Sequence, residues 1–483
     1  MAEYKVVVVT SGSNADLLAV DSRAAISHFL RKFPDEVEVI ILSGTSDDVV
    51  KEYLEMAYPA KRFEYIASGG DLKASLVKCE SKLQCPFILG QADTIVLETV
   101  PRPTVNWLGI APVPAASRLP RVRLEDGFVV ALEEPAQAEA AYGYIGVCGI
   151  ADYQVFWSAL SAQDSVASAH PLAHGLRALI ASEQKMCGVE FTWATGQSAP
   201  FRERVQFLED DRVITFFKDT ATAAACIKRA ELLRPFVPRL TETSAHGYAY
   251  KYIPGKTLAE SLVEQAAPFY DWLESEFWKG PPPEVKPAEF QEASRRVQQG
   301  LRQRIAEYWA GPQADNALWV NGTATPPCAE ILAKVEWDKL PGLPSRFHGD
   351  LRPEHVLVPA KGDTSYVLLD WVPDFGGQLA YGDRYYDLAQ LYSGLTVPYS
   401  TVRQNQYSYR EEGDRVWLDI GSSYVLQDAR SLFEEFVSRG GYDLAKIRLL
   451  AALLILASAP RQAPPLSSVL HQLGKLELTR LLF

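Results

Sequence analysis

The first part of the chain alternates between short apolar runs and helical patterns, and this alternation limits the folds that it can adopt. The apolar runs are "KVVVVTSG" from Lys5, "VEVIILSG" from Val37 and "CPFILGQADTIV" from Cys85. The helical patterns "SRAAISHFLRKF" and "SDDVVKEYLEMAY" lie between them. Such alternation predicts an α/β domain with a Rossmann-like, largely parallel sheet. We expect this domain to cover residues 1–165.

Length and charge narrow the classes of protein further. A chain of 483 residues predicts two or three domains. A formal charge of −12 argues against nucleic acid and membrane surfaces as partners. The late apolar run "LLAALLILASAP" is shorter than the ~18 residues that a membrane span needs, so we interpret it as a core helix. The six cysteines form no CxxC pair, so we interpret them as reduced thiols and expect a cytoplasmic protein without membrane insertion. The sequence does not reveal its oligomeric state.

The middle of the chain has the element order of a kinase-like small lobe. "RERVQFLEDDRVITFFKD" predicts two strands joined at an acidic turn, "TAAACIKRAELLRPF" a helix, and "HGYAYKYIPGKTL" a further strand. We therefore expect an α+β, two-lobed, protein-kinase-like region. Residues 166–255 would form a linker and the small lobe, and residues 256–483 the large lobe.

The segment "FHGDLRPEHVLV" carries the strongest chemical signal. Phosphoryl transfer needs a carboxylate beside the attacking hydroxyl and a metal ion on the phosphates. Asp350 supplies one carboxylate. Asp370 supplies a second at the end of the strand-like run "SYVLLD". The short connection between them predicts that both lie at one end of a hairpin.

Three elements in order, "HGDLRPEHVLV", "LLDW" and "GDRYYDLAQLY", resemble the aminoglycoside phosphotransferase and choline kinase-like family. The resemblance implies a kinase that uses ATP and Mg²⁺ to phosphorylate a small hydroxylated molecule. It implies that Asp350 is the catalytic base and Asp370 a metal ligand. His348 and Asp387 would support the loop.

His355 departs from the family pattern, which has asparagine at this position. An amide oxygen suits the hard Mg²⁺ ion, whereas imidazole is a softer ligand. Three interpretations follow. His355 binds the metal through a ring nitrogen, or it leaves that position to water and Asp370, or the kinase is weakened or inactive.

The small lobe should also hold a lysine that pairs with the nucleotide phosphates and with a helix glutamate. Lys218, at the end of "VITFFKD", and Glu231, in "IKRAELL", are the candidates. Lys218 could equally be a solvated lysine at a strand end. The single-glycine stretch "TWATGQSAP" from Thr192 is a candidate for the loop that covers the phosphates.

The N-terminal part resembles sugar-phosphate nucleotidylyltransferases through "KVVVVTSG", "CPFILGQADTIV" and "AYGYIGVCGIADYQVFW". In that family a glycine-rich loop with arginine and lysine follows the first strand, and an aspartate after a middle strand binds Mg²⁺. Asp93 stands at the aspartate position. The loop is missing, because "SNADLLAVDSRAAISHF" follows Ser11-Gly12. Without cationic and backbone donors the triphosphate charge is not compensated. The resemblance therefore implies a degenerate domain with a vestigial metal site.

Taken together, the two halves resemble fused nucleotidyltransferase–phosphotransferase proteins of bacterial capsule and surface-polysaccharide gene clusters. The leading hypothesis is an ATP-dependent small-molecule kinase with an inactive nucleotidyltransferase-like domain. Two alternatives remain: a non-catalytic regulatory or scaffolding protein, and a bifunctional kinase and nucleotidylyltransferase. The sequence does not identify the acceptor.

Overall fold

The computed structural model divides the chain into two compact units. The first contains residues 1–220 and 242–250, and the second contains residues 221–241 and 251–483. The structure describes residues 4–483 except 11–16, 18, 44–47, 68–71, 115–116, 135–140, 163–171, 196–203, 280–284, 311–316, 362–365, 399–400, 403 and 422. The loop after Ser11-Gly12 and most of "TWATGQSAP" lie outside these described residues.

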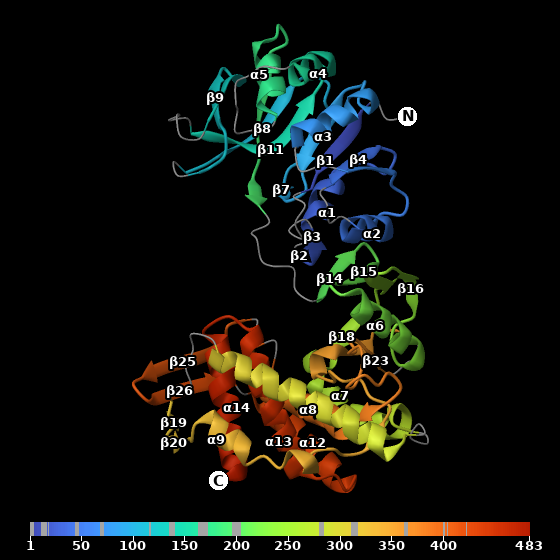
Figure 1. Cartoon of the computed structure of the whole chain (residues 1–483), viewed down its shortest axis with the longest axis vertical. Helices are drawn as coiled ribbons and strands as arrows, with labels where there is room; N and C mark the ends of the chain where they lie inside the picture. Colours follow the sequence, from blue (N-terminus) through green and yellow to red (C-terminus); the bar gives the residue numbers. More distant parts are fainter. Residues whose placement is uncertain are drawn as a thin grey trace. The chain divides into compact units, whose positions relative to one another are not determined.

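The first unit is built on a large mixed sheet (Figure 1). Its described strands run in the order β5-β4-β1-β6-β11-β8-β12-β10-β9. Their bounds are β1 Lys5–Val9, β4 Val39–Ser43, β5 Phe63–Ala67, β6 Phe87–Gln91, β8 Trp107–Pro112, β9 Arg121–Glu125, β10 Phe128–Glu133, β11 Tyr142–Ile150 and β12 Cys187–Glu190. Strands β5, β4, β1 and β6 are parallel, but β11 pairs antiparallel with both β6 and β8. The expected α/β alternation is confirmed, whereas the expectation of a largely parallel sheet is wrong.

Helices cover both faces of this sheet. The helices are α1 Ala25–Leu30, α2 Asp48–Ala57, α3 Leu72–Cys79, α4 Tyr153–Ser161 and α5 Ala173–Ala181. Residues of α1 and α2 pack in one buried cluster with alternate residues of β1 and β4. Residues of α3, α4 and α5 pack with the intervening residues of the same strands. The two faces therefore bury alternate side chains of each strand, as the period of two in a pleated strand requires.

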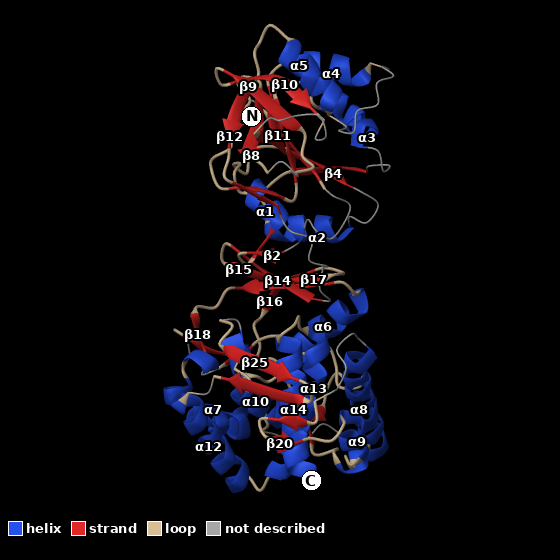
Figure 2. Ribbon diagram, turned by 90° about the vertical axis from the view of Figure 1, so that its left-hand side faces the viewer, coloured by secondary structure: helices blue, strands red, loops and turns tan. Residues whose placement is uncertain are grey.

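A second sheet of the first unit has the order β14-β15-β17-β16 (Figure 2). Its strands are β14 Arg204–Glu209, β15 Arg212–Phe217, β16 Leu240–Thr243 and β17 Gly247–Lys251. The acidic turn between β14 and β15 is formed as expected, with Asp210 at a φ of 52°, a conformation that aspartate tolerates. Two short strand pairs complete the described sheets of this unit: β2 Ala19–Val20 with β3 Arg23–Ala24, and β7 Thr94–Val96 with β13 Trp193–Thr195.

A buried carboxylate fastens the β14–β15 hairpin within the first unit. Glu209 is only 1% exposed and accepts a hydrogen bond from the Tyr53 hydroxyl of α2 at 2.8 Å. Arg31 Nη1 lies 3.6 Å from the same carboxylate and 2.6 Å from Asp210. Arg212 donates from one guanidinium to the carbonyls of Met56 and Ala57 at the end of α2. These contacts attach the hairpin to Arg31 and to α2. They explain why the hairpin is part of the first compact unit.

The second unit is mainly helical (Figure 2). Its helices are α6 Thr220–Leu232, which begins at the unit boundary, α7 Leu262–Trp272, α8 Pro287–Ala310, α9 Cys328–Ala333, α10 Arg384–Thr396, α12 Tyr424–Arg439, α13 Leu444–Ser458 and α14 Leu466–Leu482. The apolar run predicted as a core helix lies in α13, where every residue from Leu450 to Ala457 is buried. No described helix combines the length and the apolar character that crossing a membrane requires.

Short sheets position the loops of the second unit. They are β18 Gly255–Thr257 with β22 Val356–Pro359 and β23 Val367–Leu368, β21 Pro344–Ser345 with β24 Gly382–Asp383, and β20 Thr323–Ala324 with β19 Trp319–Val320, β26 Arg415–Ile420 and β25 Tyr407–Glu412. The antiparallel pairing of β22 with β23 sets Val356 opposite Leu368. Consequently the loop before β22 and the loop after β23 lie at the same end of this hairpin.

Candidate active site

The two carboxylates predicted at the hairpin end both lie beside His355. His355 Nδ1 is 3.4 Å from one Asp350 oxygen, and Nε2 is 3.8 Å from an Asp370 oxygen. Asp350 and Asp370 keep 26% and 22% of their side-chain surface exposed. The structure therefore brings Asp350, His355 and Asp370 together at one accessible place, as the sequence spacing predicts.

The backbone around His355 fixes the orientation of its ring. Nδ1 lies 2.8 Å from the carbonyl oxygen of Asp350, and a carbonyl can only accept, so Nδ1 carries the hydrogen. In the neutral ring, Nε2 then presents its lone pair on the side of Asp370. Arg352 Nη2 lies 3.4 Å from this nitrogen and can donate to it, so contact between Nε2 and a cation held by Asp370, the first of the three interpretations, requires that Arg352 move away.

Arg352 forms a forked ion pair with Asp350. Its Nε and Nη2 donate to the two carboxylate oxygens at 2.9 and 3.0 Å. Burial raises the pKa of the Asp350 carboxyl, but the charges of His355 and Arg352 outweigh it, so the pKa lies below its ordinary value. Asp350 is thus held ionised, as a proton acceptor must be. The sequence reasoning missed Arg352, although the residue stands inside the motif.

His348 and Asp387 lie beneath the loop, fully buried. Asp387, in the first turn of α10, accepts hydrogen bonds from the backbone amides of His348 and Gly349 at 2.7 and 2.6 Å. His348 Nδ1 accepts from the Asp350 amide at 3.3 Å. Burial is the largest cause that lowers the pKa of His348 to about 3, so the ring is neutral. The loop is therefore held by groups that satisfy its backbone amides.

Asp370 has a backbone conformation that is unusual for a side-chain-bearing residue. Its φ is 63°, in the left-handed region. Aspartate tolerates this region better than most residues, and such conformations concentrate at functional sites. Among the described residues, no three His, Cys, Asp or Glu side chains gather closely enough to make a complete metal site. Mg²⁺ commonly takes only one or two carboxylates and completes its shell with phosphates and water, so Asp370 with His355 fits such an ion.

Other predicted site residues lie elsewhere. Lys218 follows the end of β15 and is exposed, and Glu231 is exposed on α6. The two residues belong to different units, and their pairing stays a prediction. Asp93 lies in the turn after β6, where burial raises the pKa of its carboxyl. Its role as a metal ligand also stays a prediction.

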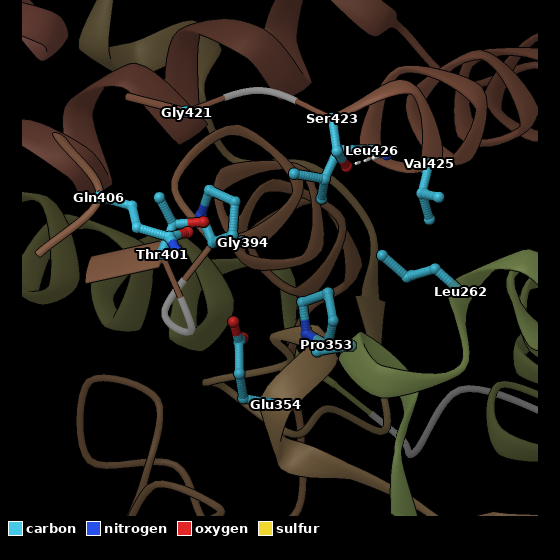
Figure 3. A pocket seen from close by; sticks show the side chains of 12 residues that line it. Leu262, Pro353, Glu354, Gly394, Thr401, Gln406, Gly421, Ser423, Val425 and Leu426 are labelled. Carbon is cyan, nitrogen blue, oxygen red and sulfur yellow. Dashed lines mark hydrogen bonds between the residues drawn. The ribbon is translucent and has the colours of Figure 1, made fainter. Parts of the chain in front are cut away.

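A cavity of about 330 Å³ opens beside the loop (Figure 3). Glu354, from the short 3₁₀ helix Pro353–His355, points into it, and Thr401 and Gln406 lie across from its carboxylate. The remaining lining residues come from α7, α10 and α12 and the segments beside them: Ala259, Leu262, Pro353, Gly394, Pro398, Gly421, Ser423, Val425 and Leu426. Pro353 and Glu354, three and four residues after Asp350 in the sequence, thus line a pocket that has both polar and apolar walls.

Comparison with known proteins identifies this part of the chain. The model of the phosphotransferase enzyme family matches residues 225–431, which include the whole loop from His348 to Asp370. This segment is therefore similar to the phosphotransferase enzyme family. The matched residues make up less than half of the chain, and no curated protein matches the sequence.

Two solved structures have a partial likeness to the chain. One, from Bacillus anthracis, is assigned as a glucose-1-phosphate thymidylyltransferase in complex with a sucrose; it has 16% identity over 40% of this chain and 89% of its own, with a TM-score of 0.35. The other is a UDP-glucose pyrophosphorylase complexed with UDP-glucose, with 13% identity over 39% of this chain and 91% of its own, at a TM-score of 0.33. Scores this low carry no conclusion about function.

Proposed function

We propose that this protein is an ATP-dependent kinase that phosphorylates a hydroxyl group of a small molecule. The observation that carries the proposal is the convergence of Asp350, His355 and Asp370 at one accessible place within a segment that is similar to the phosphotransferase enzyme family. We place the acceptor in the cavity lined by Glu354, because it opens beside the same loop. The proposal includes the two-lobed arrangement, with residues 166–255 as linker and small lobe and 256–483 as large lobe.

In the proposed reaction the acceptor oxygen attacks the γ-phosphorus of ATP while Asp350 takes the hydroxyl proton. The bond from the γ-phosphorus to the bridging oxygen breaks, and ADP leaves. Mg²⁺, when bound, neutralises charge on the phosphates. Asp370 would hold the ion, with His355 Nε2 or a water beside it. Arg352 must release the Asp350 carboxylate for the proton transfer, and the incoming phosphate anion offers its guanidinium another partner.

The test is an ATP-consumption screen against sugars, sugar phosphates and amino alcohols, with two variants as references. Asp350→Asn should abolish turnover but leave ATP binding largely intact, because only the base is removed. Asp370→Asn should weaken the binding of Mg²⁺–ATP itself. If the wild type consumes no ATP with any acceptor and does not bind Mg²⁺–ATP in calorimetry, the kinase proposal fails and a scaffolding role replaces it.

We further propose that the nucleotidyltransferase-like domain is inactive and that the protein serves surface-polysaccharide or related metabolite synthesis. The support is the missing glycine-rich loop after the first strand, with Asp93 as an isolated remnant. Calorimetry of the full chain with a pyrimidine nucleoside triphosphate and Mg²⁺ tests it. Micromolar binding that Asp93→Asn abolishes would favour the bifunctional alternative.

A further inference from the structure

Arg229 of α6 is a fully buried arginine that contacts the candidate active-site loops from below. Its exposure is 0%. Its guanidinium stacks on the ring of Phe347, with Cζ 3.9 Å from the ring centroid. The group donates to four backbone carbonyls: Nη2 to Phe347 at 2.6 Å, Nη1 to His348 at 3.3 Å and to Val372, and Nε to Leu379 at 3.2 Å. One side chain therefore bonds three separate segments of the second unit.

The positions of these carbonyls give Arg229 its significance. Phe347 and His348 directly precede the Gly349-Asp350 dipeptide, and Val372 stands two residues after Asp370. A direct backbone bond, from the Val372 amide to the His348 carbonyl at 3.3 Å, joins the same two segments. Arg229 bonds both partners of that contact. It therefore fixes the segment of the proposed base against the segment of the proposed metal ligand.

Asp387 complements Arg229 on the same loop. Asp387 accepts from the amides of His348 and Gly349, while Arg229 donates to the carbonyls of Phe347 and His348. Asp387, whose pKa burial raises to about 7, thus satisfies the donors of this stretch, and the Arg229 cation satisfies its acceptors. Two buried side chains set its position from opposite polarities of the backbone.

Removing the charged guanidinium of Arg229 from water costs free energy, because the interior solvates a charge poorly. Burial lowers its pKa to about 10, although the charge of Asp387 opposes the shift, and the group stays protonated at neutral pH. An apolar side chain of similar volume often stabilises such a site as well or better. Because the buried guanidinium of Arg229 donates its hydrogen bonds to loop carbonyls, we infer that it is needed to fix the geometry of these loops and not only to fill space in the core.

We propose that Arg229 is a positioning residue, which sets the separation of Asp350 from Asp370 by bonding the carbonyls beside both. This inference rests on the proposed kinase function, because it assigns Arg229 to the same reaction. It predicts that loss of the guanidinium misplaces both carboxylates while the remainder of the second unit stays folded.

Three full-length variants test the inference. Arg229→Met keeps the apolar stem but removes every donor, and we expect kcat to fall about 100-fold, the cost of a misplacement of about 1 Å. KM for Mg²⁺–ATP should rise by a smaller factor. Arg229→Lys keeps the charge with a single donor group and should recover part of the loss. Lys475→Met is the control, because it removes another fully buried cation of the same unit, one that donates to the Ala317 carbonyl at 2.5 Å.

We expect Lys475→Met to lower the melting temperature but to leave kcat per folded molecule unchanged. Hydrogen–deuterium exchange supplies a readout that needs no acceptor. In Arg229→Met, amides in residues 345–352 and 367–374 should exchange about 10-fold faster, and those of α13 should not change. If the wild type shows no kinase activity, the proposed function fails, and exchange alone decides the role of Arg229. Unchanged exchange in both loops, or a loss of melting temperature with kcat within threefold of wild type, overturns the inference.

Discussion

Gly394 of α10 touches the proposed catalytic loop so closely that a single methyl group should displace it. A Cβ at this position would lie 2.5 Å from Cδ of Pro353 and 3.4 Å from Cβ of Arg352. Carbon atoms in contact settle about 3.5–4.0 Å apart, so Gly394→Ala requires a shift of roughly 1 Å. The proline ring cannot rotate away. The loop backbone must move instead, and it carries Asp350.

The expected effect on stability is small, whereas the effect on catalysis is large. Overpacking costs about 1–3 kcal/mol, and alanine gains about 1 kcal/mol over glycine within a helix, so Gly394→Ala should lose roughly 2 kcal/mol or less. A loop displaced by about 1 Å should lower kcat about 100-fold. The assay is ADP formation at saturating Mg²⁺–ATP, together with thermal unfolding of the same preparation.

Gly300→Ala is the matched control. Gly300 lies in α8, and the nearest atom that its Cβ would meet is Arg304 Nη1, at 3.9 Å. This variant should gain about 1 kcal/mol of stability without any change in kcat. If Gly394→Ala keeps wild-type kcat, then contact with α10 does not set the position of the loop, and the geometric reasoning is wrong.

Three further predictions concern single side chains. His355→Asn offers Mg²⁺ a hard oxygen and should preserve or raise ATP turnover; a loss of turnover above tenfold would show that the imidazole itself is required. Burial raises the pKa of Asp383 to about 6 although backbone amides oppose it, so its native form binds a proton more tightly than the unfolded form. Its contribution to stability is therefore complete below about pH 4 and is lost as pH rises through about 6; the difference in urea stability between wild type and Asp383→Asn should shrink by about 2 kcal/mol between pH 4 and 7, and a constant difference would contradict this. Glu209→Gln removes a buried charge that Tyr53 and Arg31 contact, and it should destabilise the first unit by about 2 kcal/mol in thermal unfolding; an unchanged midpoint would show that the charge is dispensable.

Local sequence patterns were sufficient to place the two carboxylates. Asp350 and Asp370 stand on either side of a short hairpin, and the pairing of Val356 with Leu368 forces the flanking loops to meet. The α/β alternation of the first unit was predictable for the same reason, because apolar runs and helical patterns are local. The direction of β11 was not predictable, since a fully buried strand has the same apolar composition whichever way it runs.

Arg229 shows where local patterns stop being informative. It lies on an ordinary helical pattern, 118 residues before Phe347, and its partners are backbone carbonyls that have no side-chain signature. Arg352 offered a better signal, because a cation two residues after a carboxylate in a turn can fold back onto it. Long-range bonds to the main chain become visible only when the fold is known.

The interleaved membership of the two units has a practical consequence for any attempt to divide the protein. The chain passes from one unit to the other after residues 220, 241 and 250. A fragment that stops at residue 220 would lack β17, the strand between β15 and β16 in the sheet, and would leave β15 with an open edge that invites aggregation. A simple fusion of two complete modules would be joined by one linker and separated by one cut. Here a cut after residue 250 leaves the first unit complete but carries residues 221–241 of the second unit with it, so no single cut separates the two units cleanly.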